Sequence, residues 1–155
     1  MSEARVYAVR NRLSGTLLSR DGPTADRLVS DADARVALLA DRIETFVAGR
    51  VTLLAAWTDQ PEQALLTDCE AIGEAAMNIA EVAEAAGLNA VGAVARGICV
   101  LLDGHATRGV WRTDALQVHL RALTLVHDQP GKPASADLMI VEDLRSLRSS
   151  LGLTE

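Results

Sequence analysis

The stretch 70-EAIGEAAMNIAEVAEAAGLNAVG-92 decides the predicted fold, because its apolar residues repeat with the period of an α-helix. Across the wider segment 61–86, the apolar positions alternate in steps of four and three: Leu65, Cys69, Ile72, Ala76, Ile79, Ala83 and Ala86. This spacing is typical of the buried seam of a bundle helix. Gly87 suits the position just past a helix end and Asn89 suits the cap of the next helix. Helices joined so tightly are expected to be antiparallel neighbours.

The same period predicts helices along most of the remaining chain. Thr24 is a suitable N-cap for a long first helix, whose stripe is Val29, Ala32, Val36, Leu39, Ile43, Phe46, Leu53 or Leu54, and Trp57. After the helix over 61–86 we expect helices over 90–103 and from Thr113 to about Val126, separated by a loop over 104–111. Ser135 is expected to cap a last helix that ends near Leu151. No segment shows the alternation of a strand.

These elements predict an all-α fold, an elongated up-and-down four-helix bundle with about five helices in total. Residues 24–151 are expected to form a single domain, preceded by a loosely ordered N-terminal segment, 1–23. At 155 residues the chain suffices for one hydrophobic core. Its apolar residues are mostly Ala, Leu and Val with only four aromatics, a composition that favours close helix packing.

Charge and hydropathy exclude several classes of partner. A net charge of −6 argues against nucleic acid, which requires a basic face. The sequence has no run of eighteen apolar residues, which a membrane span would need, and no early apolar run of the kind found in a secretory signal. A cytoplasmic protein is therefore expected. Cys69 and Cys99 fall on apolar helix faces and are expected to be buried thiols.

Few residues suggest chemistry of their own. The glutamates at 70, 74, 81 and 84 lack a histidine-containing partner motif and are expected to form a solvated face rather than a metal site. His105 is expected in a loop, His127 at a helix C-terminus, and His119 at the margin of an apolar stripe. No motif of a nucleophilic hydrolase or of a nucleotide-binding loop is present. We therefore predict no catalytic residue, no metal and no cofactor.

The segment 75-AAMNIAEVAEAAGL-88 resembles the signature of histidine phosphotransfer (HPt) domains. In that signature a histidine is followed by an apolar residue two positions on, lysine three on, glycine four on, and a closing glycine about ten on. Ile79 and Gly87 match. Met77 stands in place of the histidine, Ala80 of the lysine and Glu81 of the glycine. A thioether cannot hold a phosphoryl group, so the resemblance implies an HPt-like bundle without phosphotransfer.

A closer resemblance covers about residues 24–151 and is clearest over 85–125. The stretches 85-AAGLNAVGAVARGICVLLDG-104 and 118-VHLRAL-123, with Trp111 between them, are similar to the small CheE-type proteins encoded with bacterial chemotaxis genes. The resemblance implies a non-enzymatic accessory protein of chemotaxis or two-component signalling. Its partner would be a response-regulator receiver domain or a histidine kinase.

Related domains meet receivers on a flank of the helix corresponding to 61–86, which assigns partner contacts here to Gly73, Met77, Ala80, Glu81 and Glu84. Three alternatives remain open. One is a phosphocarrier that uses His119 or His105. Another is a response-regulator phosphatase that orients water with Asn78 or Gln117. The third is a structural homodimer that buries the apolar stripe of the first helix.

Overall fold

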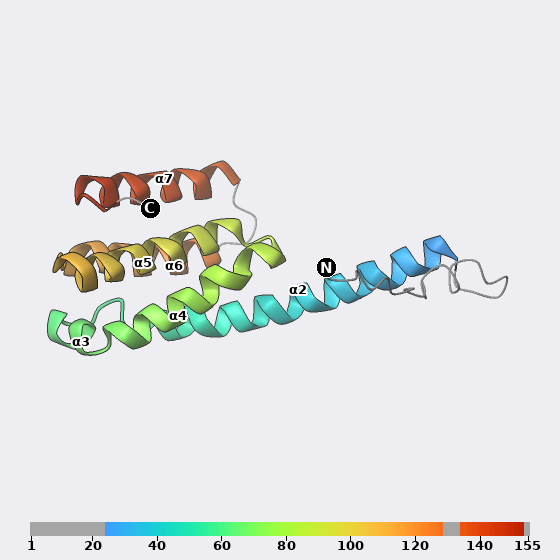
Figure 1. Ribbon diagram of the computed structural model, residues 1–155, viewed down its shortest axis with the longest axis horizontal. Coiled ribbons are helices and arrows are strands. Elements are labelled where there is room, and N and C mark those ends of the chain that lie inside the picture. The colour runs from blue at the N-terminus through green and yellow to red at the C-terminus, as the bar shows by residue number, and fades with distance from the viewer. Residues whose placement is uncertain (1–23, 129–133, 154–155) are drawn as a thin grey trace, which may run out of the picture. The chain divides into compact units, whose positions relative to one another are not determined.

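The computed structural model describes residues 24–128 and 134–153, and within these ranges every regular element is helical (Figure 1). The elements are α2 (Ala25–Ala55), α3 (Glu62–Thr67), α4 (Cys69–Val82), the 3-10 helix η1 (Ala83–Ala86), α5 (Asn89–Arg108), α6 (Thr113–His127) and α7 (Ala134–Ser150). The predicted all-α bundle of about five helices is thereby confirmed. The predicted loose segment 1–23 lies outside the described residues.

The chain divides into two compact units, residues 1–38 and residues 39–155. The single domain predicted over 24–151 stays a prediction. The helix α2 runs through the division. In the described part of the first unit, every side chain from residue 26 to residue 38 is exposed. The backbone amide of Arg27 lies 3.4 Å from the Thr24 hydroxyl oxygen, which confirms Thr24 as the N-cap.

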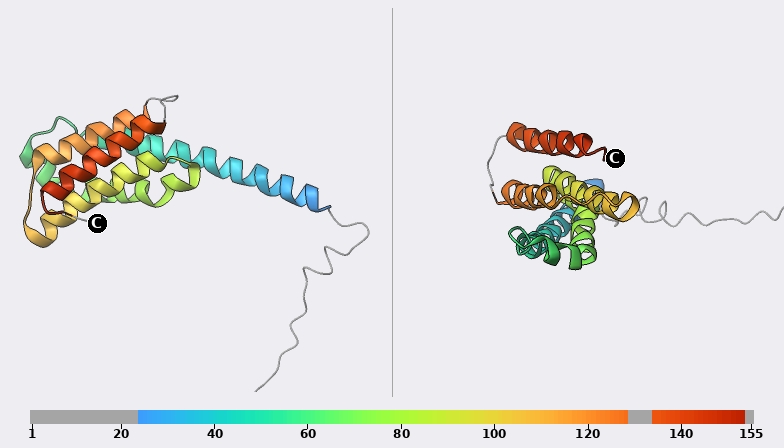
Figure 2. Two further views of the ribbon diagram at one scale, coloured as in Figure 1. Left: turned by 90° about the horizontal axis from the view of Figure 1, so that it is seen from above. Right: turned by 90° about the vertical axis from the view of Figure 1, so that its left-hand side faces the viewer.

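The second unit is a layered helical bundle with one main core. Seen end-on, α7 forms one layer, α5 and α6 the next, and α4 with the C-terminal part of α2 the third (Figure 2). The core takes buried side chains from each layer, including Val47 and Leu54 of α2, Ile72 and Ile79 of α4, Ile98 of α5, Leu120 and Leu123 of α6, and Leu144 of α7. Within the described ranges, no helix is long and apolar enough to cross a membrane.

The prediction of one continuous helix over 61–86 is wrong, because the structure has α3, α4 and η1 in this range. The helix breaks at Asp68, whose φ of −99° and ψ of 10° depart from helical values. The Asp68 carboxylate accepts a hydrogen bond from the Trp57 indole N–H at 3.1 Å. At its other end the helix tightens into η1 and closes at Gly87, as predicted, with a left-handed φ of 76° and a bond from the Leu88 amide to the Ala83 carbonyl at 2.9 Å.

Three further boundaries differ from the predictions. The loop expected over 104–111 is wrong in its first half, because α5 continues to Arg108 and ends at Gly109, which has a φ of 67°. The helix α7 begins at Ala134, so Ser135 lies inside it and is not its cap. Asn89 is the first residue of α5 rather than its cap, a position held by Leu88 without a side-chain hydrogen bond.

Gly104 explains why α5 does not stop where the sequence suggested. Its surface is covered by Leu153, which follows α7 in the chain and whose Cδ1 would lie 3.2 Å from a Cβ placed on Gly104, with Cδ2 still closer. Gly104 and Leu153 are both buried. The glycine therefore acts as a packing contact inside a helix, not as a helix breaker.

Candidate functional site

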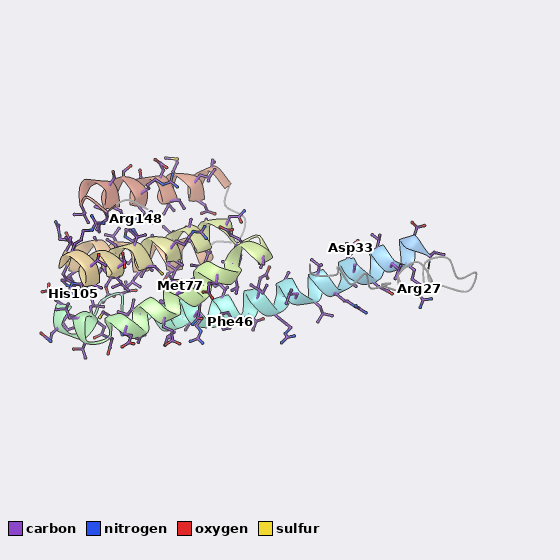
Figure 3. All side chains as sticks on the ribbon, viewed as in Figure 1. Arg27, Asp33, Phe46, Met77, His105 and Arg148 are labelled. Carbon is purple, nitrogen blue, oxygen red and sulfur yellow. The ribbon has the colours of Figure 1, made fainter. Side chains whose placement is uncertain are left out.

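The five residues predicted to contact a partner lie on α4 and on η1, which follows it, and we call them the α4 flank: Gly73, Met77, Ala80, Glu81 and Glu84. The structure divides them into two groups. Met77 is 48% exposed, and Glu81 and Glu84 are exposed as well. Gly73 and Ala80 are half-buried, with Ala80 packed against the core. Figure 3 marks the exposed Met77 on α4.

The small residues bring α4 close to α5. A Cβ on Gly73 would lie 3.4 Å from Cδ1 of Leu102, and a Cβ on Gly92 would lie 3.4 Å from Cβ of Ala83. Both distances are van der Waals contacts, so each glycine lies directly against the facing side chain. Gly73 therefore packs against Leu102 of α5. Because it has no side chain, it also leaves the surface beside Met77 uncovered.

One cation from α5 lies against the α4 flank. The Arg96 guanidinium forms an ion pair with Glu84 and places its other terminal nitrogen 3.4 Å from the Ala80 carbonyl oxygen. A solvent-exposed ion pair of this kind contributes little to stability. Its effect is to fix one charge pair at the edge of the flank, where Glu81 adds a further negative charge.

His119, an alternative phosphoryl acceptor, is fully buried on α6. Its Nδ1 donates to the Ala115 carbonyl at 2.8 Å, since a carbonyl oxygen can only accept. Nε2 is then the unprotonated nitrogen and accepts from the Arg148 guanidinium at 3.1 Å. Burial, followed by the charge of Arg148, lowers the pKa of His119 to about 4. The imidazole is neutral near pH 7, and both of its nitrogens are engaged.

Arg148 of α7 is buried beside His119, and this pair was not foreseen from the sequence. Gly97 makes room for it: a Cβ there would lie 3.0 Å from Cδ2 of His119 and closer still to the Arg148 guanidinium. The sequence carried one signal, because Arg148 follows Leu144 by four residues and so falls on the inward face of α7.

The other candidate side chains lie on α4, α5 and α6. His105 lies within α5, half-buried and edge-on to Trp111 with ring centroids 4.9 Å apart. Gln117, a candidate for orienting water, donates its amide N–H to the Gln60 carbonyl at 3.1 Å. Asn78, the other candidate, is half-buried on α4.

The described residues include no disulfide and no cluster of metal-binding side chains. Cys69 and Cys99 are free thiols and half-buried, where buried thiols were expected. Burial raises the pKa of the Cys99 thiol. Among the residues that the structure describes, no group of three or more His, Cys, Asp or Glu side chains could hold a metal ion.

Comparison with known proteins adds no assignment to this geometry. No family model, no curated protein and no solved structure matches the chain.

Proposed function

We propose that the protein is a non-enzymatic, HPt-like accessory protein of chemotaxis or another two-component pathway, which binds a receiver domain or a histidine kinase through the α4 flank and transfers no phosphate. The observation that carries the proposal is the exposure of Met77. This methionine is 48% exposed although it belongs to a helix whose neighbouring positions 75, 76 and 79 are buried.

The α4 flank has the physical character of a small docking surface. Methionine is flexible and polarizable, so it adapts to the apolar surface of a partner. Gly73 has no side chain and that of Ala80 is small, so the surface beside Met77 permits close approach of a partner helix. Glu81 and the Glu84–Arg96 pair supply a polar rim. An apolar centre with a polar rim is the usual anatomy of a specific interface.

Two features support binding without phosphate transfer. The position that resembles a phospho-accepting histidine holds a thioether, and the glutamates beside it would oppose an approaching phosphoryl group. His119 is fully buried, with Ala115 and Arg148 at its two ring nitrogens. Phosphoryl transfer to His119 would require the ring to become exposed and to lose at least one of these bonds.

The docking surface is tested by measuring binding of the purified full chain to receiver and kinase domains from the same cell, by calorimetry or biolayer interferometry. The Met77→Arg variant places a long charge at the centre of the flank and is expected to weaken binding at least tenfold, about 1.4 kcal/mol. Its matched control is Met139→Arg, because Met139 is an exposed methionine on α7. Full binding by Met77→Arg, or equal loss in both variants, would show that the flank is not the contact surface.

A second measurement separates docking from phosphate transfer. The chain is incubated with a phosphorylated receiver and then probed for an acid-labile, base-stable label, as phosphohistidine gives. We expect no label on the parent chain. A label that disappears in His105→Gln or in His119→Gln would overturn the non-transferring part of the proposal while leaving the docking part intact.

A further inference from the structure

The helix α2 carries a row of exposed apolar side chains that the α4 flank does not involve. This row, which we call the α2 stripe, consists of the exposed Val29, Ala32, Val36, Leu39 and Phe46 and the half-buried Ile43. Val29 is 60% exposed, Val36 64%, Leu39 54% and Phe46 41%. Figure 3 labels Phe46 on this helix. Large apolar side chains exposed in a row, rather than singly, indicate a surface that binds something.

We propose that the α2 stripe pairs with the α2 stripe of a second copy of this chain, as a parallel two-stranded coiled coil. The stripe advances in strict alternating steps of three and four residues, the heptad spacing of such a seam. Its a positions are Val29, Val36 and Ile43, and its d positions are Ala32, Leu39 and Phe46. Beta-branched residues at a with leucine at d favour two parallel strands over higher assemblies.

The charges beside the stripe select the parallel orientation. In a parallel pair, Arg35 at position g faces Ala40 of the second copy, so no like charges meet there. In an antiparallel pair that aligns the same apolar layers, Arg35 faces Arg42 of the second copy. Symmetry repeats this contact, so two pairs of arginines would oppose each other.

The stripe has definite limits. Beyond Phe46 the next a position is Arg50, which is half-buried with its guanidinium 5.2 Å from the centre of the Phe46 ring. Like charges would meet there in a parallel pair, so the seam should end at Phe46. Ile43 is already half-buried against the core, which leaves Val29 to Leu39 as the strongest part of the contact.

The area available fits a reversible dimer. The exposed fractions of Val29, Val36, Leu39 and Phe46 together amount to about two whole side chains per copy. With the flanking side chains of two copies, the pair buries on the order of 1,000 Å², the lower bound for a specific interface. The dimer is therefore expected to form and dissociate with protein concentration rather than to be permanent.

The test is sedimentation equilibrium of the full chain from about 1 to about 500 μM. The mass is expected to rise with concentration from 16.4 kDa toward twice that value. Val36→Lys puts two ammonium groups against each other in the seam and is expected to weaken association at least tenfold. Leu38→Lys is a closely matched control, because Leu38 is also 64% exposed but lies on the opposite side of the helix.

Both positions are exposed, so neither substitution should alter folding, and the far-ultraviolet circular dichroism of each variant checks this. A monomer at every concentration would overturn the proposal. So would equal loss of association in Val36→Lys and Leu38→Lys, because the contact would then not follow the stripe.

The orientation has its own test. In a parallel pair Val29 faces Val29 of the second copy, so chains with Val29→Cys should form a disulfide-linked dimer under mild oxidation. In the antiparallel pair the two sites would be about 25 Å apart, at 1.5 Å of rise per residue. The parent chain, which retains Cys69 and Cys99, is the control. A dimer that remains uncrosslinked in the Val29→Cys variant would overturn the parallel orientation.

Discussion

Acidification should destabilise this protein through His119. The pKa of His119 is about 4 in the folded chain, compared with about 6.5 in an unfolded chain. Between these values the unfolded state binds a proton that the folded state does not. The free energy of unfolding therefore falls as the pH drops from 6.5 towards 4, and the His119 contribution is fully present only above about pH 6.5.

The size of the effect follows from the two pKa values. A difference of about 2.5 pKa units corresponds to about 3 kcal/mol of stability, and nearly all of it is lost between pH 6.5 and 4. In the middle of that range the slope is about 1.4 kcal/mol per pH unit. A typical domain of this size has only ~5–15 kcal/mol in total, so the loss should be readily measured.

The assay is urea unfolding followed by circular dichroism at several pH values between 7.5 and 4.5, for the parent chain and for His119→Gln. Glutamine can still donate to the Ala115 carbonyl and accept from Arg148 but does not titrate, so the variant should lose this part of the slope. His127→Gln is the control and should retain it. Equal slopes in the parent and in His119→Gln would refute the assignment, because carboxylates common to both chains would then account for the whole pH dependence.

Two further predictions concern packing at glycines and at the C-terminus. Gly97→Ala should destabilise the fold by about 1–3 kcal/mol, since its Cβ would collide with the Arg148 guanidinium, whereas Gly49→Ala, which meets nothing within 4 Å, should stabilise it by about 1 kcal/mol. A thermal melt in which both changes have the same sign would contradict these contacts. Leu153→Ala should cost about 2–4 kcal/mol by opening a cavity over Gly104, and an unchanged midpoint in urea would show that the C-terminal contact is absent in solution.

The sequence predicted those parts of the fold that depend on local periodicity. Ile72, Ala76, Ile79 and Ala83 were expected on the seam of one helix, and all four are buried. Gly87 was expected to close that helix, and it does so with the left-handed backbone that glycine permits. These features follow from helical geometry and local backbone preference, which can be read without knowing the rest of the chain.

The features that escaped prediction depend on partners distant in sequence. The helix breaks at Asp68, whose carboxylate accepts a hydrogen bond from the Trp57 indole eleven positions away. The apolar residues keep their alternating steps of four and three across this break, so their pattern does not reveal it. Gly104 looks like a helix breaker until Leu153 is placed against it. The same holds for the candidate site: Met77 could be named from its position, but only the structure shows that Gly73 packs against Leu102.

The His119–Arg148 pair links the pH behaviour of the protein to the docking of α7. Arg148 belongs to α7, and His119 to α6, so their hydrogen bond joins the two helices at 3.1 Å. Protonation of Nε2 removes the acceptor and sets two cations side by side in a buried place, where repulsion is poorly screened. The same step would be needed to expose Nε2 to a phosphoryl donor. Loss of this bond would weaken the contact between α7 and α6, and this cost supports the proposed binding role over phosphate transfer through His119.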